Sequence, residues 1–337
     1  MSDMNVTIYD IAKKCHVSIA TVSRVLNGNS RVSEKTRRIV LDAIKDMGYT
    51  PNPFARGLGL DSMKIVGVLC TSLTDAFFAR AVSLIEDGMR QHHFDIMLSC
   101  TGPNTGHNSP YITGLVNKHV DGLITVGTVF SSEPDIAALT AAAGKIPVLT
   151  INCDYHQPGI YSIVCNEAEG MRRLVHTLAR QHCRHIAYLY DVRTYSGRHK
   201  LQGLRQGVKE LGIKENPALI QQVSLNLEGA EKAIENLVSR NVPFDAIVTS
   251  EDILAVGAQR AALENGRYVP VIGWNNSILA TCATPTLSSI DNRLDSLCAS
   301  AVQSMTQLLS GQDQPVPVRT EFSAILVERE SFQTKKE

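Results

Sequence analysis

The sequence is poor in aromatic residues and has no long apolar run. Phe, Trp and Tyr make up 5% of its 337 residues, and there is a single Trp. A membrane-spanning helix needs about 18 or more consecutive apolar residues, and the sequence contains no such stretch. The first ten residues, MSDMNVTIYD, carry acidic side chains and no apolar run, which argues against a secretory signal peptide. We therefore expect a cytoplasmic protein with no membrane partner.

Closely spaced cysteine pairs are also absent. The eight cysteines are scattered along the chain, and none stands in a CxxC spacing. Several lie in apolar runs such as KIVGVLC and DIMLSC, where a free Cys behaves as a small apolar residue. We expect buried free thiols in a reducing compartment instead of disulfides. The cysteines are Cys15, Cys70, Cys100, Cys153, Cys165, Cys183, Cys282 and Cys298.

The chain has no net charge as a whole, but its parts do. Lys plus Arg and Asp plus Glu both number 33, so the total predicts no partner. Residues 1–60 hold nine basic and five acidic side chains, a net charge of +4, and the remainder carries −4. A basic N-terminal segment on an acidic remainder favours an anionic polymer as the partner of that segment alone.

Apolar spacing divides the chain into three segments. From residue 7 to 47 apolar residues recur at helical spacing in three runs, with Thr7, Ser18 and Ser33 as candidate N-caps and Gly48 as a candidate C-cap. The following TPNPFARGLGLDS combines two prolines with two glycines and breaks the pattern. We place a helical domain at 1–49, a hinge at 50–62 and a body at 63–337.

The body alternates short β-branched runs with longer amphipathic segments. The strand-like runs are KIVGVL, DIMLSC, DGLITV, IPVLTI, HIAYLY, DAIVTS and VPVIGW, and helix-like segments such as GAEKAIENLVSR lie between them. Such alternation predicts βαβ units and parallel sheets. The body exceeds a comfortable single sheet, so we expect two α/β lobes, one at about 63–162 plus 292–325 and the other at about 163–291.

The N-terminal segment has the spacing of a helix-turn-helix. TIYDIAKKCHVSIATVSRVLN places a short helix, a turn and a second capped helix within 21 residues. The second helix presents four residues away from its apolar face, namely Ile19, Ala20, Ser23 and Arg24. Arg24 can donate two hydrogen bonds to guanine, while Ile19 and Ala20 can pack on thymine methyl groups. Groups suited to phosphate contacts lie nearby: Tyr9, Ser18, Thr21, Asn27 and Arg31. The alternative is a three-helix bundle with solvated basic residues.

Residues 6–58 strongly resemble the head of the lactose/galactose repressor family, most densely in VSxATVSRVLN, VSEKTR and GYTPNPFARGL. A looser resemblance continues to about residue 331. It implies an all-α helix-turn-helix head, a hinge helix, and a two-lobed α/β body like a periplasmic sugar-binding protein. Family members bind palindromic operators as dimers and change affinity when a small molecule enters the body. Where the family usually has Gly in the turn, this chain has His16, which tolerates positive φ at a strain of about 1 kcal/mol.

The resemblance also assigns roles in the hinge. Leu58, in ARGL, stands where family members wedge a leucine between base pairs from the minor groove, which kinks the duplex. Asn52 is a further DNA contact. Gly57 and Gly59 each weaken a helix by about 1 kcal/mol, so we expect the hinge to fold only on DNA. Taken alone, the segment would be interpreted as a flexible linker. The printed sequence shows no C-terminal leucine-heptad helix of the kind that tetrameric members add, so we expect a homodimer.

A ligand site is expected in the body. Ligands of α/β lobes collect at the carboxyl ends of strands, where aromatic faces can stack on a sugar and polar groups can bond its hydroxyls. The candidate effector-binding residues are Asp75, Phe77, Phe78, Asn166, Arg198, Lys200, Glu251, Asp252, Trp274 and Asn275. Each of them could equally pack the core or cap a helix.

The resemblance covers part of this set and departs from the family in residue type. Positions at which family members contact effectors match Phe77, Phe78, Lys200, Glu251 and Asn275. Lys200 stands where an arginine is usual, and Glu251 where an asparagine is usual. Asn166 and Asn275 stand where aspartates are usual. The location of the pocket therefore carries over, but the identity of the ligand does not.

Motifs for other chemistry are missing or incomplete. GLGLDS lacks the glycine spacing of a dinucleotide loop, and neither GxxxxGK[ST] nor GxSxG occurs. His182, Cys183 and His185 precede a predicted strand at a place that is structural in the family, so we expect no metal. We expect no catalytic residues and no cofactor. The sequence predicts a transcription regulator, most simply a repressor, controlled by a sugar or sugar derivative; the alternative is a cytosolic sugar-binding or sugar-processing protein without a DNA-binding role.

Overall fold

The computed structural model describes residues 6–26, 31–49, 62–102, 107–127, 130, 132–311 and 315–332. The chain forms two compact units, Met1–Lys64 and Ile65–Glu337, which we call the head and the body and describe separately. Within the described residues, every helix is too short or too polar to cross a lipid bilayer.

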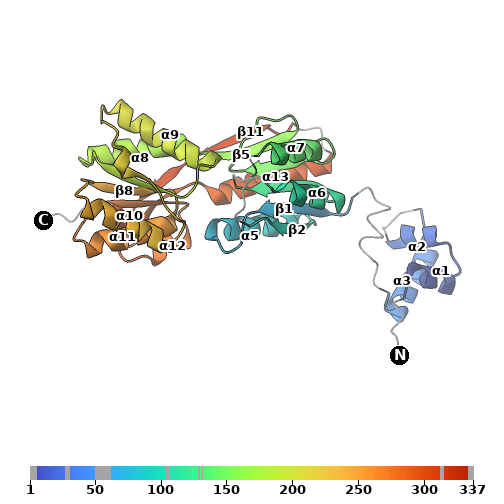
Figure 1. Ribbon diagram of the computed structural model, residues 1–337. Coiled ribbons are helices and arrows are strands. Elements are labelled where there is room, and N and C mark those ends of the chain that lie inside the picture. Colours follow the sequence, from blue (N-terminus) through green and yellow to red (C-terminus); the bar gives the residue numbers. More distant parts are fainter. Residues whose placement is uncertain are drawn as a thin grey trace. The chain divides into compact units, whose positions relative to one another are not determined.

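The described part of the head contains three helices around a small apolar core (Figure 1). They are α1 (Ile8–Lys14), α2 (Ile19–Leu26) and α3 (Glu34–Met47). Each helix contributes buried residues to one shared cluster, which consists of Ile11, Ala12, Val22, Val25 and Val40. The three predicted helical runs therefore meet in one core, which holds α1 and α2 in place as a helix-turn-helix.

Serine caps begin α2 and α3, and both were predicted. Ser18 Oγ accepts a hydrogen bond from the backbone N–H of Thr21, and Ser33 Oγ accepts one from that of Thr36, each at 3.2 Å. These bonds satisfy donors that a helix leaves free at its start. Gly48 ends α3 at φ 63°, in the left-handed region that favours glycine, which confirms the predicted C-cap.

Thr7 is the N-cap of α1, as predicted, and forms a capping box with Asp10. The Asp10 carboxylate accepts from the backbone N–H of Thr7 at 2.9 Å and from the Thr7 hydroxyl at 2.6 Å. The turn after α1 also agrees with the prediction. The turn between α1 and α2 contains His16 at φ 53°. His16 therefore adopts the positive φ at which the family usually has glycine, and the turn is formed.

The body consists of two lobes, each built on a six-stranded sheet. The strands of the first lobe are β1 (Ile65–Cys70), β2 (Asp95–Cys100), β3 (Gly122–Val126), β4 (Val148–Ile151), β5 (Ile160–Asn166) and β11 (Arg319–Ser323). Those of the second lobe are β6 (Ile186–Tyr190), β7 (Ile220–Gln222), β8 (Ala246–Thr249), β9 (Val271–Trp274), β10 (Ser288–Asp291) and β12 (Ile325–Val327). The strand orders are β11-β5-β4-β3-β1-β2 and β12-β10-β9-β8-β6-β7. All neighbouring strands are parallel except β10 and β12.

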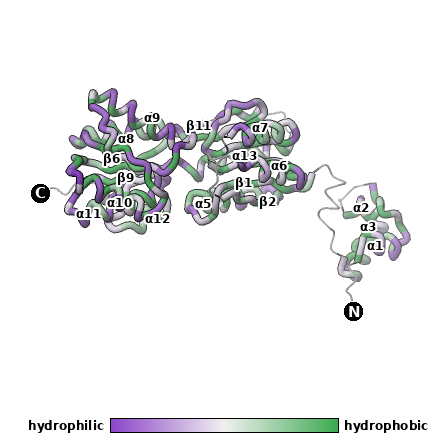
Figure 2. Tube along the Cα trace, in the orientation of Figure 1, coloured by the Kyte–Doolittle hydropathy of each residue, from purple (hydrophilic) through white to green (hydrophobic). Residues whose placement is uncertain are grey.

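Helices cover both faces of each sheet. In the first lobe, the helices on one face are α5 (Ala76–Gln91) and α13 (Leu294–Ser310), and those on the other are α6 (Ser109–Asn117) and α7 (Glu133–Ala143). In the second lobe, the two pairs are α10 (Leu227–Ser239) with α11 (Asp252–Glu264), and α8 (Glu167–Arg180) with α9 (Tyr195–Glu210). The short α12 (Ile278–Cys282) and two 3-10 segments (Pro217–Leu219 and Glu330–Phe332) complete the lobe. Figure 2 shows hydrophobic strands between more polar helices. The predicted two-lobed parallel α/β fold is confirmed.

The chain passes between the lobes three times. It leaves the first sheet after Asn166, returns between β10 and α13, and leaves again between Ser323 and Ile325. The first passage follows the end of β5, somewhat beyond the expected boundary near 162. The last places residues 325–332 in the second lobe, because β12 pairs with β10 there. Three segments of the chain therefore connect the two lobes.

All eight cysteines are free thiols. Five are fully buried, as expected, and Cys15 is partly buried, but Cys100 and Cys282 are exposed. Cys100 ends the edge strand β2, which has no neighbour to cover its outer side. Cys282 ends the short helix α12.

Candidate functional sites of the head and the body

The outward face of α2 carries the predicted base-contacting residues. Val22 and Val25 are buried, so the opposite side of the helix faces solvent. Ile19 is 40% exposed, Arg24 is exposed and no acidic residue lies in the first turn. Within the described residues, Arg24 forms no ion pair. Its guanidinium is therefore available to an acceptor outside the chain, as a base contact requires.

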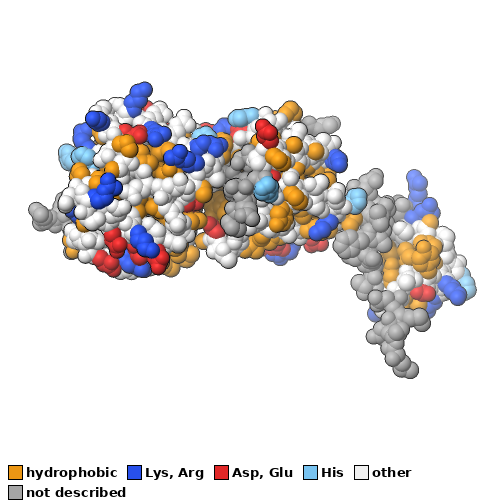
Figure 3. All heavy atoms as spheres, in the orientation of Figure 1, with side chains coloured by type: hydrophobic (Ala, Val, Ile, Leu, Met, Phe, Trp, Pro, Cys, Tyr) orange, Lys and Arg blue, Asp and Glu red, His pale blue; other side chains and the backbone are white. Residues whose placement is uncertain are grey.

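The remaining head residues form a polar and basic surround. Tyr9, Ser18, Ala20 and Arg31 are exposed. Thr21 and Ser23 are half-buried, and Figure 3 shows Lys and Arg side chains on the surface of the head. Three further candidates lie outside the described residues: Asn27, Asn52 and Leu58. The contacts of all these residues with DNA remain predictions.

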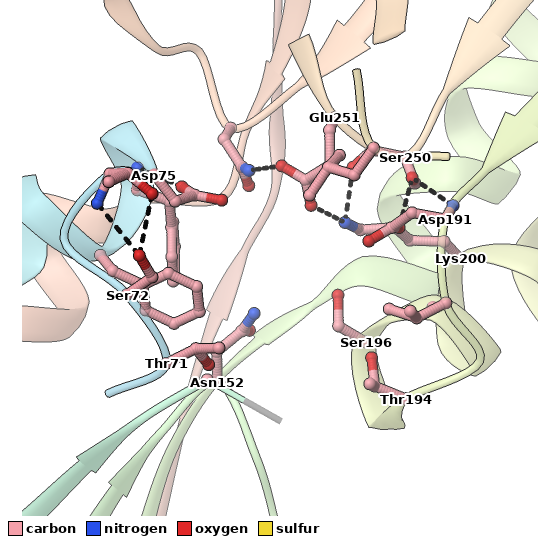
Figure 4. A pocket seen from close by; sticks show the side chains of 18 of the residues that line it. Thr71, Ser72, Asp75, Asn152, Asp191, Thr194, Ser196, Lys200, Ser250 and Glu251 are labelled. Atoms are coloured by element: carbon pink, nitrogen blue, oxygen red, sulfur yellow. Dashed lines mark hydrogen bonds and ion pairs between the residues drawn. The ribbon is translucent and has the colours of Figure 1, made fainter. Parts of the chain in front are cut away.

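The body contains a cavity of about 590 Å³ between its two lobes (Figure 4). The residues that follow β1, β3 and β4 line it from the first lobe, and those that follow β6, β7, β8 and β9 line it from the second. Parallel strands direct their carboxyl ends to one edge of a sheet, so the two sheets turn these edges toward the same space. The cavity is thus a product of the topology.

An aromatic pair forms part of the wall from the first lobe. Phe77 and Phe78, in the first turn of α5, pack edge to face with ring centroids 5.2 Å apart. Gly127, at φ 93° after β3, makes room for one of these rings, because a Cβ atom there would lie 2.7 Å from Phe78 Cε1. Apolar ring faces in a polar cavity suit the C–H face of a sugar ring.

Lys200 is the buried centre of the wall from the second lobe. Its ammonium group donates to the backbone oxygen of Ser250 at 3.0 Å and lies 3.7 Å from Glu167 Oε1 and 3.8 Å from Glu251 Oε1. It also lies 4.9 Å from the centre of the Trp274 ring, a cation–π distance. Pairing and hydrogen bonding make the burial of this charge tolerable.

Three carboxylates line the cavity. Asp75 caps α5 by accepting from the backbone N–H of Phe77 at 2.8 Å. Asp191 accepts from Ser250 Oγ at 3.0 Å, and Glu251 accepts from the Asn275 amide. Burial raises the pKa of Asp75, and the charge of Asp191 raises it further. Burial likewise holds the pKa of Glu251 well above its usual value, although Lys200 opposes the shift.

The lining includes six of the ten residues predicted from the sequence, namely Asp75, Phe77, Phe78, Lys200, Glu251 and Asn275. Asp252 and Trp274 are not in this lining, but both line an adjoining pocket of about 390 Å³ that shares Asp75, Phe77, Glu251 and Asn275 with the cavity. Asp252 is buried behind the wall, where it accepts from Ser289 Oγ and from the backbone of Ser277, each at 2.6 Å. Trp274, the last residue of β9, points into the core of the second lobe and supports Lys200 from behind.

Asn166 and Arg198 also lie outside the lining. Asn166 caps α8 by accepting from the backbone of Glu169 at 3.0 Å. Its amide also donates to Glu321 at 2.9 Å, which links the start of α8 to β11. Arg198 is exposed on α9 and donates to the backbone oxygen of Arg193 at 3.0 Å. Both side chains have structural partners in place of a ligand.

Sequence reasoning missed several lining residues that the strand-end rule could have found. Thr71 follows β1, Asn152 follows β4, Asp191 follows β6 and Ser250 follows β8. Asn152 and Asp191 come directly after strand-like runs that were recognised in the sequence, Ser250 ends such a run and Thr71 lies two positions beyond one. Ser196, on α9, gave no such signal, because its place in the wall depends on how that helix packs.

Comparisons with known proteins agree with this architecture. The family model described as bacterial regulatory proteins, lacI family, matches residues 7–52, and that of a periplasmic binding protein-like domain matches residues 175–332. The chain is 40% identical over 332 residues to an HTH-type transcriptional regulator of Lachnoclostridium phytofermentans, covering 96% of this chain and 98% of the relative. It is 30% identical to the HTH-type transcriptional regulator DegA of Bacillus subtilis, covering 85% and 86%.

A solved structure extends the likeness to the whole chain. The Lac repressor dimer, bound to operator and the anti-inducer ONPF, superposes with a TM-score of 0.86 at 26% identity, covering 97% of this chain and 99% of that one. Relatives of this kind are transcription regulators. From its three-helix head, its two-lobed body and its full-length relatives, the chain belongs to the lacI family of bacterial regulatory proteins and is a DNA-binding transcription regulator.

Proposed function

We propose that the chain represses transcription by binding a palindromic operator as a homodimer, and that a small carbohydrate in the interlobe cavity controls its affinity for DNA. A helix-turn-helix reads one half-site, and two-fold symmetry of the protein matches two-fold symmetry of the operator. The Lac repressor structure, a dimer on its operator, supports this arrangement by likeness. We further propose that residues 1–49 bind DNA, that residues 50–62 form the hinge, and that residues 63–337 bind the effector.

The lining of the cavity supports a carbohydrate as the effector. It combines the Phe77–Phe78 pair with hydroxyl, amide and carboxylate groups at the ends of six strands. Such a mixture of one apolar wall and many hydrogen-bonding groups suits a polyhydroxylated ring. Its volume, about 590 Å³, falls within the usual range of ligand pockets.

Operator binding measured with and without sugars tests the proposal. Genome-wide footprinting identifies the operator, and fluorescence anisotropy of the full chain on that duplex then gives its affinity in the presence of each member of a mono- and disaccharide panel. We expect one sugar to change the affinity at least about tenfold, a coupling of about 1.4 kcal/mol. The Phe78→Ala variant should lose most of this response, and Tyr111→Ala, an exposed aromatic of α6 outside the cavity, should keep it.

The rival function is sugar processing without control of DNA. The full chain incubated with the same panel should return each sugar unchanged. Turnover of a sugar, with no effect of that sugar on operator binding, would favour the rival.

A further inference from the structure

The charges that line the cavity are unbalanced. Asp75 faces it from the first lobe, and Asp191 and Glu251 face it from the second (Figure 4). Among the described lining residues Lys200 is the one cationic side chain. The wall therefore presents three carboxylates and one ammonium group, distributed over both lobes.

The positive charge of Lys200 is already offset within the protein, because its ammonium group donates to a backbone oxygen and lies within 4 Å of two carboxylates. Lys200 is 2% exposed, and an ammonium has three donors. Three protein oxygens lie within 4 Å of its Nζ, on Ser250, Glu167 and Glu251. Glu167 is itself buried beneath the wall, so Lys200 already faces two carboxylates before any ligand enters. A phosphate or carboxylate in the cavity would meet acidic side chains with no free cation to offset them.

A second observation points to a ligand that donates hydrogen bonds. Asn152, which follows β4, is 6% exposed, lines the cavity and points into it (Figure 4). Among the residues that the structure describes, none provides a hydrogen-bond partner for its Oδ1 atom. A buried amide oxygen without a partner is costly, and a hydroxyl or amino group of a ligand would satisfy it. The carboxylates of Asp75 and Asp191 are hydrogen-bond acceptors as well, so they too would bind a hydroxyl or amino group of a ligand.

We propose that the cavity accepts effectors with hydroxyl or amino groups and rejects those with a phosphate or carboxylate group. This inference rests on the proposed function of the cavity as the effector site, and it selects among sugar derivatives: free sugars and amino sugars bind, whereas sugar phosphates and uronic acids do not. Asp75 and Asp191 determine this selectivity, because they act as acceptors for donors on the ligand and repel anions from opposite lobes.

One feature of the wall, the start of a helix, attracts anions and so opposes the effect of the carboxylates. The first turn of α9 borders the cavity, and Thr194 does not cap it with a side-chain hydrogen bond. A helix start attracts anions with about half a unit charge. Asp191 stands three residues before Thr194 and also lines the cavity, so its full negative charge outweighs that attraction. The first turn of α5, on the other side, is already capped by the Asp75 carboxylate.

Matched sugars test the selectivity. Isothermal titration of the full chain is carried out with glucose, glucosamine, glucose 6-phosphate and glucuronic acid, and with the corresponding sets built on galactose and mannose. In each set that binds, the neutral or amino member should bind at least about a hundredfold more tightly than the anionic members, as expected for like charges at contact distance in a partly buried site. An anionic member that binds as tightly as its neutral parent overturns the proposal.

Substitutions identify the residues responsible. In Asp191→Asn the preference for the neutral over the anionic member should fall about tenfold, because one of the repelling charges is gone. Glu228→Gln removes the same charge from an exposed site on α10, outside the cavity, and should leave the preference unchanged. An equal fall in both variants would mean that overall charge, and not the cavity, sets the preference.

A measurement without sugar separates this proposal from the proposed function. Because the charge of Asp191 opposes that of Asp75, Asp191→Asn should raise the melting temperature of the full chain at neutral pH, and the gain should shrink as the pH falls and Asp75 takes up a proton. A lowered or unchanged melting temperature at neutral pH overturns the charge argument. Failure of every sugar to bind or to alter operator affinity, together with the expected rise, would overturn the carbohydrate effector and leave the charge selectivity standing.

Discussion

Lys200 and Glu167 show how the wall of the cavity depends on paired, buried charges. Glu167 is 1% exposed and accepts from Ser196 Oγ at 2.8 Å, so the first turn of α8 is bound to the first turn of α9. Burying two charges costs several kcal/mol unless they are paired and hydrogen-bonded. The pair therefore positions the cavity wall, and ligand recognition is left to Asn152, Asp191 and the other groups at the strand ends.

Arg24 is the residue on which sequence-specific binding should depend most. Arg24→Ala should weaken operator binding by about 1–3 kcal/mol and relax the preference at one guanine in each half-site, because a bidentate contact is lost. Competition titrations with operator and random duplex at one salt concentration measure both effects. An equal loss on the two DNAs would show that Arg24 only contacts phosphate.

Gly127 should prove sensitive to a single added methyl group. In Gly127→Ala the new Cβ would lie 2.7 Å from the Phe78 ring at a φ of 93°, so both crowding and backbone strain oppose it. We expect a loss of about 2 kcal/mol in unfolding free energy and a displaced Phe78. Gly114→Ala, in α6 with open space around its Cβ position, is the control and should be neutral or stabilising by up to about 1 kcal/mol. Equal behaviour of the two variants in urea denaturation would contradict this account.

At the scale of elements, α8 and α9 form a closely packed pair on one face of the second sheet (Figure 1). Two glycines of α9 permit the approach. A Cβ atom at Gly203 would lie 2.1 Å from the backbone oxygen of Ala168, and one at Gly207 would lie 2.8 Å from Val175 Cβ. Because α9 also carries Ser196 and Lys200, this contact sets the position of the cavity wall.

Gly203→Ala should therefore separate the two helices. The obstacle is a backbone atom that cannot rotate away, so we expect a destabilisation of at least about 3 kcal/mol and weaker ligand binding. Gln202→Ala, at the exposed neighbouring position on the same helix, should lie within about 0.5 kcal/mol of the parent chain. Chemical denaturation of both variants checks the difference, and a mild effect at Gly203 would mean that α9 can shift without cost.

The outer surface of the same helix pair carries an ionic network that should respond to acid. Glu210 of α9 accepts from Arg172 of α8 at 2.9 Å and lies 2.7 Å from His176 Nε2. Hydrogen bonds from His176, Gln206 and Arg172 lower the pKa of Glu210 to about 2. A depressed carboxylate pKa adds stability above the usual value of 4.5, and that contribution is lost as the pH falls from there toward 2.

The Glu210→Gln variant should accordingly be less stable than the parent chain at neutral pH and equal to it near pH 2. Solvent and salt screen this exposed network, so we expect a small difference that high salt reduces further. Melting temperatures across the acid range, at low and high salt, provide the measurement. A difference that stays constant over the whole range would exclude the ionic origin.

At the scale of the whole molecule, the regulator has to act as a symmetric assembly if its operator is palindromic. We predict a homodimer at micromolar concentration, since two heads are needed to contact two half-sites about one helical turn or a multiple of it apart. Sedimentation equilibrium of the full chain measures the mass, for which a protomer of 36.8 kDa sets the unit. A mass near one chain or near four chains would contradict the prediction.

The sequence by itself determined the features that depend on neighbours along the chain. Helical spacing and the serine caps of α2 and α3 are local, because a helix pairs each residue with those three or four positions away. Seven strands were recognised for a similar reason: buried parallel strands are continuous apolar runs, and the partly exposed edge strand β2 contains such a run as well. Five strands were missed: β5, β7, β10, β11 and β12. Of these, β7, β10 and β12 are only three or four residues long, whereas β5 and β11 mix polar residues into their apolar runs.

Only the tertiary structure decided which strand-end residues meet in the cavity. Trp274 and Asn275 are adjacent in sequence, yet the first points into the core beneath α8 and the second lines the cavity, because side chains alternate along a strand and the helix cover fixes which side is core. Likewise Asp252 and Glu251 divide between an internal hydrogen-bond network and the cavity wall. Asp75 and Asp191 are 116 positions apart and come to line one cavity through the order of strands in two sheets and the passages between them. The order of the strands cannot be predicted from spacing along the chain, because that order results from packing between elements distant in sequence.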